Sequence, residues 1–291
     1  MRDSHRADNI RIAEPSVARA CRMSMAARPF ALGLLLSSAA AWAGHEAVDE
    51  LPVVAKLEAP KGTRFVIRGV LTAARAKQLT AIATEVQRDV TRRFLSGADQ
   101  SSQPPVQLCL FETAKAYADF NSKLLDGRAP PSELGFFDPA LRVVVANVGL
   151  SIGNLRHEMT HALLGDDFPE IPSWLTEGAG SLYGTATEKD GAFVFVANYR
   201  LRHLREARKN GTLPTLDELV AAPPEIVYGP RVLAFYGLAR HLLLYLDRRG
   251  ELPKFYAEFR AAKPDERARV LKKYVDEPKF LAWTDGLVIG R

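Results

Sequence analysis

The chain is poor in cysteine, with two in 291 residues. Cys21 lies in an N-terminal segment that has the pattern of a leader, so only Cys109 remains in the rest of the chain. A single cysteine excludes an intramolecular disulfide, even in an oxidising compartment. Cys109 lies in the apolar run Val106–Phe111, which predicts a buried strand and a packed core thiol.

Long apolar runs are also lacking, and so are repeats and low-complexity tracts. The stretch Val232–Leu246 is apolar but carries Arg240 and His241, so it predicts a core helix rather than a membrane span. The other apolar stretch, residues 31–42, is too short to cross a bilayer comfortably. We therefore expect no membrane span.

The N-terminal apolar stretch has the pattern of a secretory signal peptide. Arg28 precedes it, and residues 41–43 read Ala-Trp-Ala, the small-residue pattern at which signal peptidase cuts. We expect residues 1–43 to be a leader and the exported, periplasmic or secreted chain to begin at Gly44. No cysteine follows that point directly, so we expect no lipid anchor.

An excess of charge of one sign is lacking once this leader is set aside. The first 43 residues hold six of the 39 basic and three of the 34 acidic residues, which leaves 33 and 31. The near balance of basic and acidic residues therefore removes the main electrostatic argument for a nucleic-acid partner. Residues 1–22 are Arg-rich and lie upstream of the leader pattern, so we expect translation to begin at Met23 or Met25, or the leader to have a long basic region.

One local basic cluster remains in the second half of the chain. It predicts a solvated helix face, and the alternative is a surface for an acidic substrate or a lipid. The cluster consists of Arg200, Arg202, His203, Arg205, Arg208 and Lys209.

The chain contains one strong motif, an H-E-x-x-H segment that begins at His157 and ends at His161. Residues four apart lie about 40° apart around a helix, so both imidazoles point the same way and can hold one metal ion. Glu158 is turned by about 100°, where it reaches a water beside the metal without binding the metal itself. Ser151 or Asn154 caps the helix. The plain alternative is an amphipathic helix whose histidines face solvent.

The residues that follow supply a third ligand. A catalytic zinc ion usually takes three protein ligands and leaves one position open. Two prolines end the first helix, Ser173 is a good cap for a second, and Glu177 falls in the first turns of that second helix. We therefore expect His157, His161 and Glu177 to hold Zn²⁺.

Two glycines in the second helix support a close crossing of the two helices. Gly178 and Gly180 each cost a helix about 1 kcal/mol relative to alanine. That cost is understandable if the helices meet closely at the metal, where a side chain would not fit.

The motif and the segment Trp174-Leu175-Thr176-Glu177-Gly178 together resemble the gluzincin metallopeptidases, in which a glutamate on a following helix is the third zinc ligand. The chain looks like a family of small exported proteins with a peptidase-MA-like domain, over about residues 60–265. The resemblance implies an α+β, zincin-like fold with a thermolysin-type catalytic core, a small mixed sheet, two metal-binding helices and a C-terminal helical lobe. It does not extend to aminopeptidase activity, because the G-x-M-E-N segment that holds a substrate amine is missing.

One rival for the third ligand is Asp167. In the metzincins the motif continues as H-E-x-x-H-x-x-G-x-x-H, and Asp167 stands at the place of the last histidine. Leu164 occupies the place of the glycine, without which the helix cannot turn back so tightly. Glu177 is therefore the favoured ligand.

The resemblance also implies a mechanism. Glu158 takes a proton from a zinc-activated water and returns it to the leaving amine of a peptide. The carbonyl oxygen needs a hydrogen-bond donor besides zinc. By resemblance Tyr236 is the expected donor and Tyr228 the second candidate, while plain core packing is the alternative for both. His241 is expected to be structural or exposed.

The sequence does not identify the groups that bind the second ring nitrogen of each histidine, the one that faces away from the metal. A metal-bound histidine usually donates its other ring N–H to a carboxylate or a carbonyl. Ser181 stands where the next turn of the Glu177 helix would supply an acid. Asp166, Asp167 or a backbone carbonyl could serve instead.

We expect residues 44–150 to form an α+β lobe and residues 151–291 to hold the metal helices and a helical lobe. By resemblance, the strand Arg142–Asn147 lies at the edge of the sheet, lines the cleft and can pair with an extended substrate. The expected strands are Arg64–Gly69, Val106–Phe111, Arg142–Asn147 and Ala192–Val196, and the expected helices of the first lobe are Thr72–Leu95 and Thr113–Leu125.

The sequence therefore predicts an exported zinc metalloprotease that hydrolyses a peptide or protein substrate. One alternative is a catalytically idle, zincin-like binding protein of the cell envelope, and another is a zinc hydrolase of a non-peptide substrate. Glu158 favours an enzyme, because a binding protein needs no general base. The oligomeric state is left open.

Overall fold

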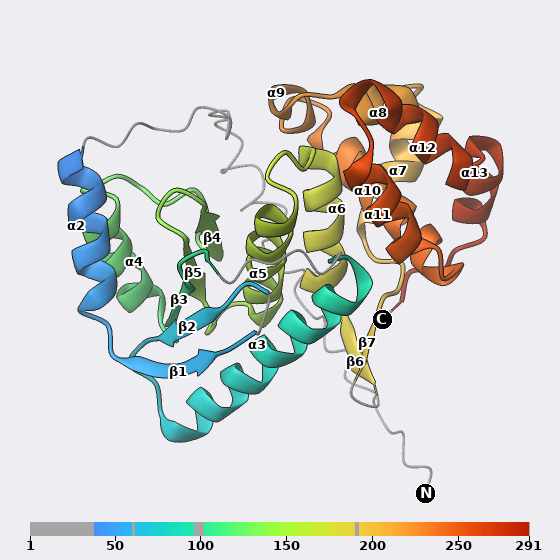
Figure 1. Ribbon diagram of the computed structural model, residues 1–291. Coiled ribbons are helices and arrows are strands. Elements are labelled where there is room, and N and C mark those ends of the chain that lie inside the picture. The colour runs from blue at the N-terminus through green and yellow to red at the C-terminus, as the bar shows by residue number, and fades with distance from the viewer. Residues whose placement is uncertain (1–37, 60–61, 96–101, 190–191, 291) are drawn as a thin grey trace, which may run out of the picture.

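The β-branched and apolar runs of the first half of the chain form one mixed sheet (Figure 1). In the computed structural model, which describes residues 38–59, 62–95, 102–189 and 192–290, the strand order is β1-β2-β3-β5-β4. β2, β3 and β5 run parallel, whereas β1 and β4 pair antiparallel at the two edges. The strands are β1 Val53–Leu57, β2 Phe65–Arg68, β3 Val106–Phe111, β4 Gly135–Asp138 and β5 Val143–Asn147.

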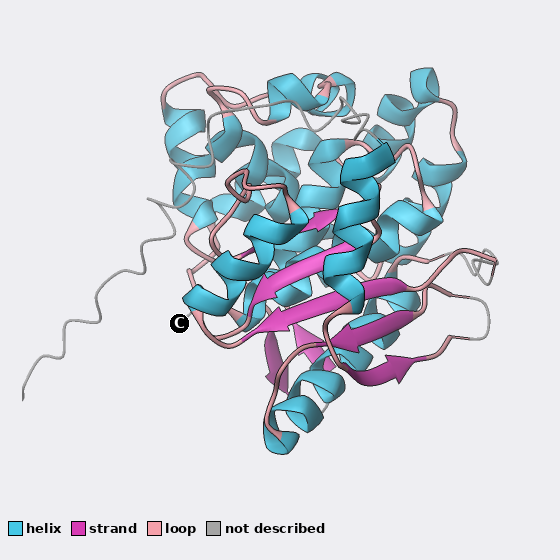
Figure 2. Ribbon diagram, turned by 90° about the vertical axis from the view of Figure 1, so that its left-hand side faces the viewer, coloured by secondary structure: helices cyan, strands magenta, loops and turns pink. Residues whose placement is uncertain are grey.

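The expected edge position of the strand Arg142–Asn147 is wrong. β5 hydrogen-bonds to β3 on one side and to β4 on the other, so no substrate can pair with it. β4 is the outermost strand on this side, with Gly135 opposite Ala146 and Asp138 opposite Val143. Figure 2 shows the strands of the sheet side by side, with helices in front of them and behind.

Side-chain alternation along the strands divides the core between the two faces of the sheet. On one face, Ile67, Leu108 and Val144 pack against α3 (Ala73–Arg93) and α5 (Ile152–Asp167). On the other face, Cys109 and Val145 pack against α2 (Ser38–Asp49) and α4 (Ala114–Leu124). The thiol of Cys109 is fully buried, as the sequence predicts.

Local capping explains where the two predicted helices of this region begin. Thr72 and Thr113 have extended backbones, and their side chains accept the N–H groups of Arg75 and Ala116. Each hydroxyl therefore satisfies an otherwise unpaired donor of the first turn. α3 and α4 lie within the ranges expected from the sequence, Thr72–Leu95 and Thr113–Leu125.

α2 crosses the predicted cleavage point between residues 43 and 44. Gly44 lies against Leu141, and Ala47 and Val48 are buried beside α4. The part of α2 that follows the cleavage point therefore belongs to the packed structure. The predicted leader up to residue 37 lies outside the described residues.

The rest of the chain is helical apart from one small hairpin, the second strand of which corresponds to the expected strand Ala192–Val196. A continuous apolar core runs from the sheet through α5 to the C-terminal helices, and within the described residues no helix is long and apolar enough to cross a membrane. These elements are α6 Ser173–Gly184, β6 Thr187–Lys189, β7 Ala192–Val194, α7 Arg200–Lys209, α8 Leu216–Ala221, α9 Pro224–Val227, α10 Val232–Arg248, α11 Leu252–Ala261, the 3₁₀ helix η1 Pro264–Glu266, α12 Arg267–Tyr274 and α13 Glu277–Asp285.

The fold is thus α+β, with a small mixed sheet followed by many helices, which confirms the expected class at this level. α10 is the predicted core helix, and Arg240 and His241 on it are fully buried. It packs against α6 and α7, so it brings the C-terminal helices up to the helices of the metal motif.

Candidate metal centre

The motif lies on α5, and that helix is anchored at its start and along one face. The Ser151 hydroxyl accepts the Asn154 N–H at 3.0 Å, so Ser151 is the cap. Leu155, Met159 and Ala162 are buried in the main core. With that face fixed, His157 and His161 point away from it, toward α6.

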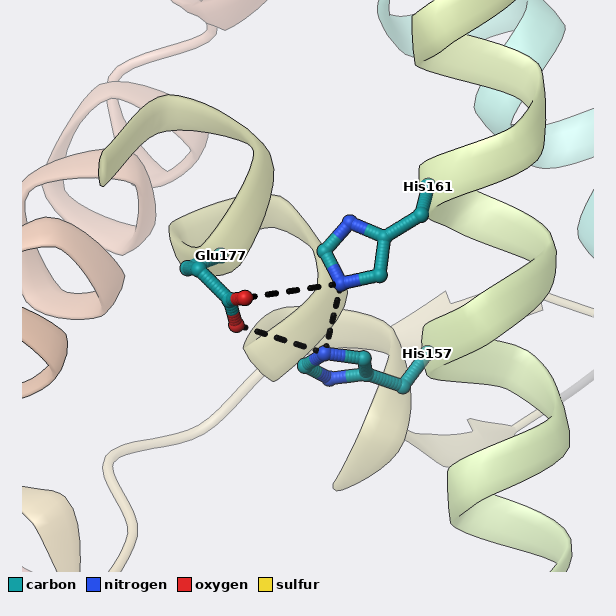
Figure 3. Close-up of side chains that lie close together, drawn as sticks. All are labelled: His157, His161 and Glu177. Carbon is teal, nitrogen blue, oxygen red and sulfur yellow. Dashed lines mark hydrogen bonds and ion pairs between the residues drawn. The ribbon is translucent and has the colours of Figure 1, made fainter. Parts of the chain in front are cut away.

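α6 folds back beside α5 and brings Glu177 to the two histidines (Figure 3). The helix begins at Ser173, after Pro172 in the cap position, and no side chain caps it. The expectation that Ser173 caps this helix is therefore wrong. Packing against α5 and α10, rather than a cap, holds this helix in place.

Three ligand atoms converge between these helices. The Nε2 atoms of His157 and His161 lie 2.8 Å apart. The carboxylate oxygens of Glu177 lie 3.4 Å from His157 Nε2 and 3.8 Å from His161 Nε2. Ligand atoms about 2.1 Å from a tetrahedral ion stand about 3.4 Å from one another. Glu177 lies at such a spacing, and the two imidazoles would have to separate slightly for the three side chains to hold one metal ion.

His157, His161 and Glu177 form the one group within the described ranges that could hold a metal ion. All three candidate ligand atoms lie within 4.8 Å of one another. Asp167, the rival ligand, lies elsewhere: its carboxylate accepts the Tyr256 hydroxyl at 3.1 Å and pairs with Arg260.

Metal binding needs deprotonated ligands, and the charges of the cluster favour this state for two of the three, His161 and Glu177. Burial, together with the charge of His157, lowers the pKa of the His161 imidazole to about 4. Burial alone would raise the pKa of Glu177, but His157, His161 and the Tyr228 hydroxyl lower it to about 2. His161 is therefore neutral and Glu177 ionised near neutral pH. The pKa of His157 is raised, because Glu177 and Glu158 outweigh the effect of burial.

Glu158 lies beside the cluster and is buried, with 8 % of its surface exposed. Burial raises the pKa of its carboxyl to about 7, although the charge of His157 opposes this. The backbone N–H of Phe137 also acts to lower it, which places β4 beside the Glu158 carboxylate. A carboxyl with a pKa near neutrality can both accept and return a proton.

Both candidate tyrosines reach this site. The Tyr228 hydroxyl, at the end of α9, donates to Glu177 Oε1 at 2.9 Å. Tyr236, on α10, lies with its ring centroid 6.4 Å from that of Tyr228. Burial and the Glu177 carboxylate raise the pKa of both phenols, so both keep their protons and can donate hydrogen bonds. His241 is buried, with Nδ1 2.7 Å from the Gly237 carbonyl oxygen, as expected for a structural residue.

The outer partner of His161 is a residue that the sequence did not indicate. The Nδ1 atom of His161 lies 2.7 Å from Thr176 Oγ1, so with a metal at Nε2 the ring donates to this hydroxyl. The acids considered from the sequence are engaged elsewhere, because Asp166 binds Arg142 through two hydrogen bonds and Asp167 binds Tyr256.

The glycines of α6 allow close packing on both sides of the helix. A Cβ atom at Gly180 would lie 2.9 to 3.0 Å from three atoms of the His157 ring. A Cβ at Gly178 would lie 3.1 Å from the backbone of Ala239 on α10. The predicted close approach of the two helices is therefore confirmed at Gly180, which lies against the His157 ring, whereas Gly178 serves the packing of α10.

No protein-family model matches the chain, and no curated protein matches it either. Its function is therefore inferred from the geometry of the site.

Proposed function

We propose that this protein is an exported, zinc-dependent peptidase of the gluzincin type with a thermolysin-like, zincin-type catalytic core. The convergence of His157, His161 and Glu177 beside the buried Glu158 carries the proposal. Two imidazoles and a carboxylate are a donor set typical of catalytic zinc. Glu158 is a fourth, buried side chain beside them that is not needed to hold a metal, and hydrolysis requires such a carboxyl group as a base.

A bound zinc ion supplies Lewis acidity, which polarises a carbonyl and makes water acidic near neutral pH. Glu158 then acts as general base: its carboxylate accepts a proton from the attacking water. The same oxygen returns the proton to the leaving amine nitrogen, and the peptide bond breaks. The burial of Glu158 keeps bulk water from competing for this proton.

The two tyrosines take different roles in the proposal. Tyr228 already donates to Glu177, so it holds the ligand carboxylate in place. Tyr236 lies beside Tyr228 and also interacts with the Glu177 carboxylate. In the proposal its hydroxyl turns to the substrate and donates to the carbonyl oxygen as negative charge develops there.

The substrate backbone is proposed to lie along β4. Among the strands of the described residues, β4 pairs with β5 alone, and the Phe137 N–H acts on Glu158. An extended peptide added to the open side of β4 would run past the general base, by the strand addition that many peptide-binding proteins use. Strand pairing of this kind recognises the peptide backbone and favours a peptide over other substrates.

The test combines metal analysis with hydrolysis of a peptide library by the purified protein. We expect about one zinc ion per chain, lost in Glu177→Ala and kept in Glu170→Ala, which removes an exposed acid from the loop before α6. Glu158→Gln should keep zinc and lose hydrolysis, and Tyr236→Phe should lower turnover by about ten- to a thousandfold with zinc unchanged.

Two results would contradict the proposal. Absence of zinc from folded protein, even after zinc is added, would leave a zincin-like binding protein. Hydrolysis that is unaffected by Glu158→Gln would remove this residue from the mechanism.

A further inference from the structure

One arginine beside the metal cluster has no acidic partner. Arg200 is the first residue of α7, and its guanidinium carbon lies 4.8 Å from the ring centre of Tyr236 and 5.5 Å from that of Tyr199. Within the described part of the chain, no carboxylate oxygen lies within 4.0 Å of its nitrogen atoms. Its Nε atom is also buried and has no hydrogen-bond partner.

The rest of the basic cluster shows how unusual this is. Arg205 donates to three backbone carbonyls near the C-terminus, and Arg208 binds the Asp285 carboxylate. Arg202 is exposed. Most of the cluster therefore has structural partners or faces solvent, and Arg200 alone is turned to the tyrosine of the proposed active site.

A second guanidinium, that of Arg240, adds to the positive charge near Arg200. Arg240 is fully buried and donates to the backbone carbonyls of Ser181 and Val196, the second at 2.7 Å. Burial and the charge of Arg200 lower its pKa to about 9, so it still carries its proton near neutral pH. Within the described residues, neither arginine lies within ion-pair distance of a carboxylate. Arg240 therefore adds to the positive potential around Arg200, and this potential favours the binding of an anion there.

A short chain of contacts links Arg200 to the candidate metal ligands. Its guanidinium carbon lies 4.8 Å from the ring centre of Tyr236, and that ring lies 6.4 Å from the ring of Tyr228. Tyr228 in turn donates to the Glu177 carboxylate. A ligand group bound to Arg200 would therefore lie beside Tyr236, the residue proposed to donate to the reacting carbonyl.

We infer that Arg200 binds a carboxylate of the substrate, and that the site takes peptides carrying a carboxylate close to the cleaved bond. The inference rests on the proposed peptidase function. Stacking on Tyr236 holds the guanidinium plane, and its N–H groups form the fork that fits a carboxylate through two hydrogen bonds. The carboxylate is either the C-terminus of the peptide or an Asp or Glu side chain.

Binding to the inactive variant Glu158→Gln, loaded with zinc, tests this without turnover. Four N-acetylated probes are compared: tetra-alanine with a free carboxylate or a carboxamide, and an amidated tetrapeptide with one internal Glu or Gln. We expect a carboxylate probe to bind about 10- to 100-fold more tightly than its neutral partner. Adding Arg200→Gln should reduce that ratio to about one, and Arg200→Lys should restore part of it.

Arg202→Gln is the matched control, because it removes the same charge from the exposed side of the same helix. It should leave the ratio unchanged, and the zinc content should be equal in all variants. Preference in the first pair of probes would identify the C-terminal carboxylate, and preference in the second pair an acidic side chain. Either result supports the inference.

Equal binding of charged and neutral probes would overturn the inference. A preference for the carboxylate probe that survives Arg200→Gln would overturn it as well. Hydrolysis of the peptide library by the wild-type protein is measured separately. Hydrolysis without a carboxylate preference refutes the inference alone. An Arg200-dependent preference without any hydrolysis refutes the peptidase and keeps the carboxylate site.

Discussion

At the scale of single residues, Gly180 fixes how closely the two metal helices approach. Gly180→Ala would place a Cβ atom 2.9 Å from the His157 ring, which has to move. We expect the zinc affinity to fall by about 10- to 100-fold, the range found when the support of a ligand is lost. Competition with a chelator of known affinity measures it.

Gly165 on α5 gives the control, because a Cβ there would meet nothing within 4 Å. Gly165→Ala should leave zinc affinity unchanged and raise the free energy of unfolding by about 0.5–1 kcal/mol, since alanine is the better helix former. An equal loss of zinc in both variants would mean that helix stability, rather than the position of His157, controls binding.

That His157 and His161 lie together could be predicted from the sequence because their spacing is local, whereas the hydroxyl beside His161 could not. His157 and His161 share a helix face by geometry alone. Thr176 was not indicated, because a threonine beside Glu177 carries no sign of where its hydroxyl points. Asp166 looked suitable because it is an acid near the motif, but Arg142, 24 positions earlier in the sequence, binds it.

At the scale of elements, the C-terminal end of α5 is tied to the sheet by charge. Arg142, just before β5, binds Asp166 through two hydrogen bonds of 2.7 and 2.9 Å, and the side chains are 19 % and 8 % exposed. Asp166→Asn leaves a largely buried guanidinium without its charge partner. We expect the free energy of unfolding to fall by about 3 kcal/mol in denaturant titration, with zinc content unchanged.

Asp119→Asn is the matched control, because Lys115 and Asp119 form an exposed pair, 83 % and 62 % exposed. It should change stability by less than about 1 kcal/mol. Loss of zinc in Asp166→Asn at full stability would instead assign Asp166 to the metal site.

The strands differ in how well the sequence indicated them, and the difference has a physical cause. β3 was predicted with its observed bounds, because both faces of a central strand are buried and the run is apolar except for Gln107. β4 was missed because it has only four residues and begins at Gly135, a residue type that is depleted in strands. Because β4 was not predicted, β5 was expected to be the edge strand of the sheet.

At the scale of the whole molecule, metal binding should stabilise the entire fold. The ligands lie on two helices that share one apolar core with the sheet and with α10. A ligand that binds only the folded chain stabilises it by about 4 kcal/mol at a concentration a thousand times its Kd. We expect the melting temperature to rise with zinc concentration in the wild-type protein and to stay constant in Glu177→Ala.

A melting temperature that is independent of zinc in a protein shown to bind it would contradict this expectation. It would mean that the unfolded chain binds zinc as tightly as the folded one does.

The predicted leader has a consequence for the mature fold. Cleavage after residue 43 would shorten α2 to Gly44–Asp49, the part that contains the buried Ala47 and Val48. We therefore expect mass spectrometry of exported protein to find Gly44 at the N-terminus and the fold to be retained. Exported protein that keeps residues 1–43 would refute cleavage at this position.

The buried thiol of Cys109 gives the mature chain a built-in reporter of opening. Burial raises the pKa of Cys109 to about 12, and the side chain is fully covered on β3. Thiol reagents attack the thiolate, so labelling has to wait until the sheet separates from α2 and α4. The rate of labelling therefore measures how often the sheet is uncovered, and no cysteine has to be introduced for the measurement.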